Sequence, residues 1–199
     1  MKNYQSQFRP LYVILIFIFM HNCKILGQIE FIPDTTINSI ISLCDISSSF
    51  LFNSDLDTNA IIRDGELDFF KEEQPFVLFL NSSKTEYLLA IIHEGTWDFY
   101  FSEFKVGVIS NGILQKINIP HIVTQYQNFH TENNIHIGMP VETLEKLKGM
   151  KYIRTGNKIK YCHNSLDSEF MEYGECEYYF ECELINNKIS KFRFGYTPI

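Results

Sequence analysis

The chain has 199 residues and a formal net charge of −7 at neutral pH, with 24 acidic and 17 basic side chains. A chain this acidic repels phosphate backbones, and no basic stripe in the sequence offsets that repulsion, so nucleic-acid binding is not expected. The charge favours solubility or, less commonly, a cationic partner.

An apolar run near the start of the chain predicts an export signal. Basic residues precede the run Leu11–Met20, and Gly27 supplies a small residue at a suitable cleavage point. A membrane-spanning helix needs about 20 apolar residues, and this run has half that length. Two alternatives stay open: a lipoprotein acylated at Cys23, although Asn22 fits a lipobox poorly, and a buried N-terminal strand. We expect residues 1–27 to be a cleaved signal peptide and the mature chain to be periplasmic or extracellular, without stable membrane insertion.

Four cysteines follow the predicted leader, and an exported chain permits disulfides among them. They are Cys44, Cys162, Cys176 and Cys182. No pair has the Cys-x-x-Cys spacing of a redox or zinc site. Cys162 and Cys176 flank a predicted turn and form the preferred disulfide. Four small buried hydrophobic residues are the alternative interpretation.

The chain after the leader has the pattern of two related units. Residues 28–112 form the first unit, residues 113–134 a connection, and residues 135–199 the second unit. Each unit is expected to be a short helix followed by antiparallel strands. The expected fold class is therefore α+β, with the two units either separate or joined in one continuous sheet.

The first expected helix rests on apolar spacing. Ile37, Ile40, Ile41 and Cys44 stand at i, i+3, i+4 and i+7, which places them on one helical face. Asp34, just before them, is a favourable N-cap.

The second expected helix begins after Pro140, which is tolerated in the first helical turn. Val141, Leu144 and Leu147 then line one face, and Gly149 suits the C-terminal stop. We therefore expect a short helix between Pro140 and Gly149.

Strands are expected after each helix. In the first unit they cover residues 76–80 and 87–92, and in the second unit residues 175–185 and 189–196. A further strand is expected within residues 95–110.

The register of the last hairpin follows from its side chains. Apolar and charged residues alternate in the strand 175–185, so one face is apolar and the other acidic. A three-residue loop, Asn186–Lys188, pairs Phe180 with Phe194, Cys182 with Phe192, Glu181 with Arg193 and Glu183 with Lys191. A shift of one residue would place core positions opposite charges. Burial of the aromatic face, at about 1.5–3 kcal/mol per large side chain, favours the first register.

The segment from Ile135 to Gly149, with the sequence IHIGMPVETLEKLKG, resembles the opening of BamE/SmpA-OmlA-like domains. Those domains begin with an Ile-x-x-Gly-Met phrase and a short helix, followed by an antiparallel sheet. Tandem copies occur in the beta-lactamase-inhibitor-like architecture. The resemblance implies a small exported envelope protein that binds other proteins. This chain departs from the pattern at Pro33-Asp34 in the first unit and at Met150-Lys151 after the helix. No functional residue carries over, because the motif residues are structural.

Motifs of catalytic and cofactor sites are missing from the sequence, including the nucleophile elbow, the P-loop and the zincin motif. His121, His130 and His136 could meet on adjoining elements, but exposed loop histidines are the simpler interpretation. The glutamates of the strand 175–185 could supply paired carboxylates for glycoside chemistry, but alternation explains them as a solvated face. We therefore assign no catalytic, cofactor-binding or metal-binding residue.

An aromatic cluster is the sharpest candidate for partner binding. It consists of Trp97, Phe99, Tyr100, Phe101 and Phe104. The aromatic residues occupy both odd and even positions, so they point to both faces of a strand. Such a strand is either covered on both faces or partly exposed as a binding surface. The second interpretation is a hypothesis of function, because binding surfaces concentrate exposed aromatic side chains.

Together these features favour an exported, non-enzymatic protein-binding module of the bacterial cell envelope. Its partner would be another envelope or secreted protein. An immunity or inhibitor protein against a secreted enzyme or toxin is the alternative, because the acidic charge suits a basic target. A hydrolase with an unrecognised site is the third interpretation.

Overall fold

The computed structural model describes residues 31–39, 41–43, 61–62, 70, 72, 74–93, 100–109, 119–163 and 177–197. The chain divides into two compact units, Met1–Glu30 and Phe31–Ile199, and every described residue belongs to the second. The predicted signal peptide, residues 1–27 with Cys23, lies outside the described residues. Within the described part, no helix has the length and apolar character that would let it cross a bilayer.

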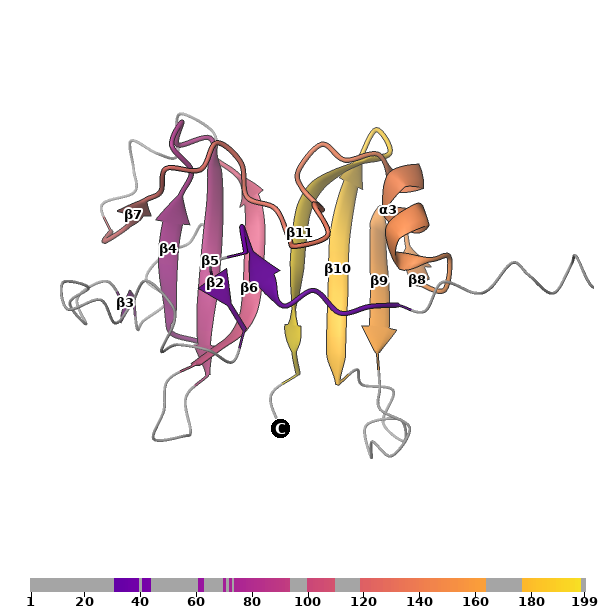
Figure 1. The fold of residues 1–199 in the computed structure, drawn as a ribbon, viewed down its shortest axis with the longest axis horizontal. Helices are drawn as coiled ribbons and strands as arrows, with labels where there is room; N and C mark the ends of the chain where they lie inside the picture. Colours follow the sequence, from indigo (N-terminus) through magenta and orange to yellow (C-terminus); the bar gives the residue numbers. More distant parts are fainter. Residues whose placement is uncertain are drawn as a thin grey trace, which may run out of the picture. The chain divides into compact units, whose positions relative to one another are not determined.

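The regular structure of the described residues consists of eleven strands and the helix α3 (Figure 1). In chain order the elements are β1 (Thr36–Ile37), β2 (Ile41–Ser42), β3 (Ile61–Ile62), β4 (Phe76–Leu80), β5 (Glu86–His93), β6 (Tyr100–Val108), β7 (Ile122–Val123), α3 (Val141–Lys148), β8 (Ile153–Thr155), β9 (Lys158–His163), β10 (Tyr178–Ile185) and β11 (Lys188–Tyr196). Nine strands form one sheet, in the order β3-β4-β5-β6-β11-β10-β9-β8, with β7 also paired to β4. All of its pairings are antiparallel except the one between β7 and β4.

The expected α+β fold of two helix-led units is wrong. The described residues are mainly β-structure, and α3 is their only helix. The pairing of β6 with β11 joins strands from residues 28–112 with strands from residues 135–199 in one sheet. The two parts of the chain therefore share a sheet without sharing a helix-then-sheet plan.

The first expected helix is a β-hairpin. Thr36–Ile37 pairs with Ile41–Ser42, and Ile37 lies opposite Ile41. Asn38 and Ser39, in the loop, have positive φ angles of 52° and 55°, which interrupt a right-handed helix. Cross-strand partners around a three-residue loop are four positions apart, as are neighbours on a helical face. The β-branched residues on both sides of the loop favour the strands.

The second expected helix is confirmed, but its buried face differs. The helix spans Val141–Lys148, between Pro140 and Gly149, and the N–H of Gly149 donates to the carbonyl of Glu145 at 2.8 Å. Val141 and Leu144 are buried as expected, whereas Leu147 is 39% exposed and Lys148 only 2%. The side chain inserted into the core at the end of the helix is therefore the lysine.

The predicted register of the last hairpin is confirmed, and the predicted loop is wrong. Phe180 lies opposite Phe194 and Cys182 opposite Phe192. The turn, however, contains only Asn186 and Asn187, both with positive φ, and a bulge after Glu183 restores the register. The argument from side chains identified the partners correctly, but it could not detect an extra residue within a strand.

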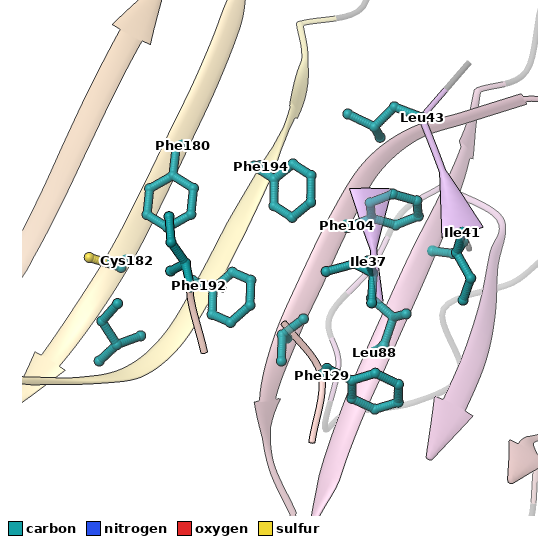
Figure 2. Packing of buried hydrophobic residues seen from close by; sticks show 14 of the residues in the cluster. Ile37, Ile41, Leu43, Leu88, Phe104, Phe129, Phe180, Cys182, Phe192 and Phe194 are labelled. Atoms are coloured by element: carbon teal, nitrogen blue, oxygen red, sulfur yellow. The ribbon is translucent and has the colours of Figure 1, made fainter. Parts of the chain in front are cut away.

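One large apolar cluster lies on a single face of the sheet and extends across both parts of the chain. The segment 31–43 crosses this face (Figure 1). Figure 2 shows Ile37, Ile41, Leu88, Phe104 and Phe129 on one side and Phe180, Phe192 and Phe194 on the other. A second cluster covers the opposite face of β4 and β5 only, and contains Phe70, Phe76, Leu78, Leu80, Tyr87, Leu89, Ile91 and Ile109.

Candidate functional site

The sheet face opposite the large core cluster is polar over the strands β6, β11, β10 and β9. We call it the charged face; it comprises Glu103, Lys105, Lys158, Lys160, Glu181, Glu183, Lys191 and Arg193 together with Tyr179. Alternation along each strand places every second side chain here. One row of cross-strand partners runs Lys105, Arg193, Glu181, Lys160.

Opposite charges pair across the strands of the charged face. Arg193 lies 3.3 Å from Glu181 and 3.7 Å from Glu103, and Lys158 lies 3.2 Å from Glu183. The sequence predicted an acidic face from the glutamates of β10 alone. Basic residues on β9 and β11 flank those glutamates, so the face carries mixed charge and does not present the acidic surface that would suit a basic toxin.

Glu103 is the carboxylate of the charged face with the most perturbed environment. Its side chain is 14% exposed, and burial raises its pKa, while Lys105, the Tyr179 hydroxyl and Arg193 oppose the rise. Burial and the neighbouring Glu103 raise the pKa of Tyr179. The Tyr179 ring also lies under the Arg193 guanidinium, 5.5 Å away. These contacts describe a structural network around Tyr179.

A shallow hollow of about 220 Å³ lies over the charged face. Its walls include Glu72, Lys105, Lys158, Glu181 and Lys191. Glu103, whose pKa is raised by burial, is not among the lining residues. Across the described part of the chain, no group of three His, Cys, Asp or Glu side chains is placed to hold a metal ion. The hollow offers ionic contacts from both acidic and basic side chains.

The second candidate surface is apolar and lies where α3 ends and β8 begins. We call it the β8 corner; it comprises Ile32, Leu147, Met150 and Ile153. Met150 is 77% exposed, Ile32 65% and Ile153 63%. Ile32 is held near the helix end, because its carbonyl accepts a hydrogen bond from Lys148 Nζ at 2.8 Å. Ile153 lies opposite Lys160 in the register and therefore points to the charged side of the sheet, whereas α3 packs on the core side. The edge of the sheet thus has exposed apolar residues on both of its sides, a feature more typical of an interaction site than isolated exposed residues are.

The β8 corner also has basic residues and a free sheet edge. Lys146, Lys151 and Arg154 are exposed in the same stretch of chain. The described strand order ends at β8, which pairs only with β9 among the described strands. An edge strand presents unpaired N–H and C=O groups to which an extended segment can add. The corner thus combines apolar side chains, positive charge and backbone hydrogen-bonding groups.

Two side chains of the predicted aromatic patch are described, and both are buried. Phe101 and Phe104 are 0% exposed, and their ring centroids lie 5.7 Å apart in the core. Trp97 and Phe99 lie outside the described residues, and of Tyr100 only the backbone is described, as the first residue of β6. The burial of these two side chains agrees with a strand that is covered and not with an exposed binding surface.

A bulge explains why Phe101 and Phe104 have opposite parity but share one face. Ile92 lies opposite Phe101 and Ile91 opposite Glu103, so Ser102 is an extra residue in β6. Gly195, on β11, faces this bulge, and a Cβ there would collide with the Ser102 carbonyl and lie 2.7 Å from the Cα of Glu103. Glycine at that position allows β11 to approach the bulged strand.

The cysteines have different states. Cys162 is disulfide-bonded, but Cys176, its predicted partner, lies outside the described residues, so that pairing stays a prediction. Cys182 is a free thiol, 1% exposed. Burial raises the pKa of Cys182 to about 12, which keeps it in the unreactive thiol form.

Two of the three histidines considered as a metal site are neighbours. His130 and His136 form an antiparallel bridge. Their Nδ1 atoms contact the carbonyls of Thr131 and Asn134, at 3.0 and 2.7 Å. The Nδ1 of His121 contacts its own local carbonyl of Ile119. Local backbone contacts thus account for all three.

The β8 corner was missed at the sequence level. The helical spacing predicts burial of Leu147, and Met150 stands out in the sequence only as a departure from the BamE-like motif. A basic residue follows each of Leu147, Met150 and Ile153 in the sequence, and such residues lie mostly at protein surfaces, which is the one local signal of exposure in this stretch.

No protein-family model matches the chain, and comparisons with curated proteins and with solved structures found no match.

Proposed function

We propose that this chain is an exported, non-enzymatic module that binds an extended segment of another envelope or secreted protein at the β8 corner. The observation that carries the proposal is the exposure of Ile32, Met150 and Ile153 beside β8, the last strand in the order of the described sheet. Burial of these side chains by a partner would contribute about 1.5–3 kcal/mol for each one fully covered.

The chemistry of the corner indicates the character of the bound segment. Main-chain hydrogen bonds from β8 would hold an added strand, and apolar side chains on one face of that strand would cover Ile153. Lys151 and Arg154 are exposed beside them. A segment that alternates apolar and acidic residues complements this surface, since rim charges increase the association rate and discriminate against basic segments.

A pair of matched variants tests the proposal. Ile153 on β8 and Ile185 at the tip of the last hairpin are both 63% exposed. We expect Ile153→Asp to weaken capture of a specific protein from the native periplasm or medium by at least about tenfold, as for a central interface residue. Ile185→Asp should leave capture unchanged, because it lies outside the corner.

The alternatives give different results in the same experiment. Equal capture by wild type and by both variants would contradict the β8 corner as the binding site. Binding of the wild type to vesicles rich in anionic lipid, with loss in Ile153→Asp, would instead assign the corner to a membrane surface. Turnover of a polymer substrate, lost on substitution of Glu181 or Glu183, would favour the hydrolase interpretation.

A further inference from the structure

A lysine and an aspartate from distant parts of the chain meet in the interior. Lys148 Nζ, at the end of α3, lies 2.5 Å from Oδ2 of Asp34, in the segment that crosses the sheet. The two side chains are 1% and 0% exposed. Ion pairs this deeply buried lose the hydration of both charges, and the loss favours the neutral amine and the neutral acid.

The lysine amine is oriented toward the carboxyl group by a largely aromatic pocket. Its Nζ lies 4.6 Å from the ring centroid of Phe31 and 5.3 Å from that of Phe180. One N–H donates to the carbonyl of Ile32 at 2.8 Å. Burial lowers the pKa of Lys148, while Asp34 opposes that shift. The neutral form is the nucleophilic form of an amine.

The carboxyl group of Asp34 is held from its other side. The side-chain amide of Asn133 donates to Oδ1 at 2.8 Å. The backbone N–H of Asp34 donates to the hydroxyl oxygen of Tyr178 at 2.9 Å, which anchors the residue. A donor on Oδ1 stabilises the negative charge that would develop there when a nucleophile attacks Cγ.

We propose that Lys148 and Asp34 condense to form an intramolecular amide bond between Nζ and Cγ. One proton passes from the ammonium group to the carboxylate across the short contact, which gives an amine and a carboxylic acid. Nζ attacks Cγ, and Oδ1 carries the developing charge against Asn133. A second proton from nitrogen reaches Oδ2, the Cγ–Oδ2 bond breaks, and one water molecule leaves. The reaction needs no oxidant or cofactor, and proximity replaces an encounter in solution.

Other lysine–carboxylate pairs in the same chain show what distinguishes this one. Lys105 Nζ lies 2.6 Å from Glu72, nearly as close, but these side chains are 14% and 12% exposed. The pair Lys158–Glu183 is more exposed still. Access of water keeps such pairs ionised, so closeness without dehydration leaves an ordinary ion pair.

The bond would tie the N-terminal segment to the end of α3. Ile32 is two residues before Asp34, and Leu147 is next to Lys148 in the sequence. The bond would therefore also hold these two residues of the β8 corner near each other. The proposal does not depend on partner binding there, since it concerns only the interior of the chain.

Intact-mass spectrometry of the reduced, full mature chain tests the proposal directly. We expect a mass lower than that of the sequence by one water molecule, and a branched proteolytic peptide that joins the segments around Asp34 and Lys148. Lys148→Arg, which keeps the charge but cannot form this amide, should have the full mass of its sequence. Asn133→Ala should accumulate the uncondensed form, because Oδ1 loses its donor.

A wild-type mass equal to that of the sequence would overturn the proposal, whatever the variants do. A water loss that persists in Lys148→Arg would also overturn it, because the dehydration would then lie elsewhere. The wild-type measurement does not require any variant to fold.

Discussion

Two regions of one sheet differ in how many of their faces are buried. All five residues of β4, FVLFL, are buried, whereas β10 alternates between buried and partly exposed positions. The change is visible along one row of cross-strand partners, which runs from Leu89, 1% exposed, through Lys105 and Arg193 to Glu181. The same face of the same sheet is core at one end and charged at the other.

The difference shows that strand patterning reports the number of covering layers. A continuous apolar run indicates a strand covered on both faces, and alternation indicates one covered face. In β4 and β5 the second face is covered by Phe70 and Ile109, and among the described residues no apolar cluster covers the corresponding face of β10. Four predictions, which use seven substitutions, test this difference.

Truncation at the two ends of the row should have the largest and most unequal effects. Leu89→Ala leaves a cavity in the smaller core cluster and should lower the free energy of unfolding by about 2–5 kcal/mol. Glu181→Ala removes a partly exposed ion pair and should cost no more than about 1 kcal/mol. Urea unfolding followed by circular dichroism measures both. Similar losses would mean that the charged face is also covered.

Two glycines in strands differ in what an added Cβ atom would contact: rigid backbone in one case and a movable side chain in the other. Gly195→Ala places a Cβ against the backbone of Ser102 and Glu103, whereas Gly107→Ala meets the end of the Tyr87 side chain. We expect about 1–3 kcal/mol of destabilisation for Gly195→Ala, as for overpacking, and less for Gly107→Ala. Thermal unfolding of the two variants provides the comparison, and the reverse order would contradict the bulge at Ser102 as the reason for glycine.

The turn of the last hairpin tests how its register is maintained. Asn187 has a φ of 56°, so Asn187→Ala should cost about 1 kcal/mol and Asn187→Gly should cost nothing or stabilise slightly. The cross-strand contacts of Phe180 with Phe194, seen by NMR, should persist in both variants. A shifted register in Asn187→Ala would show that the turn, and not the aromatic face, selects the pairing.

Glu103 should make the free energy of unfolding depend slightly on pH. Its pKa is raised in the folded chain, chiefly by burial, so the protonated form favours folding. This contribution is fully present below the unfolded pKa and is lost as the pH rises through the folded pKa. Glutamine does not ionise, so the Glu103→Gln variant keeps this contribution at every pH. Its free energy of unfolding should therefore rise relative to that of the wild type between mildly acidic and neutral pH. Urea unfolding midpoints across that range measure the difference in stability between the variant and the wild type. A difference that narrows with rising pH would contradict the raised pKa of Glu103.

The predictions that came from side-chain identity were the most successful. Alternation in β10 identified the partners of Phe180 and Cys182, and Pro140 and Gly149 bounded the one described helix. The loop length was wrong because a bulge adds a residue without changing which side chains match. The first helix was wrong because Ile37 and Ile41 are four residues apart in a helix and across a tight hairpin alike.

The candidate site was less predictable than the fold. The spacing of Leu147 favoured burial, but Lys148 entered the core because Asp34, more than a hundred positions earlier, lies there to receive it. That choice left Leu147 exposed beside Met150 and Ile153. Nothing local to the helix reveals the aspartate.

Patterns within a few residues of the sequence were enough to predict the strands β4, β5, β6, β10 and β11 and the face that the last hairpin buries. The pairing of β6 with β11, the ion pairs across the four strands of the charged face, and the contact of Asp34 with Lys148 appear only in the folded chain. Each of these depends on segments far apart in the chain, whose contacts form only when the hydrophobic core brings them together.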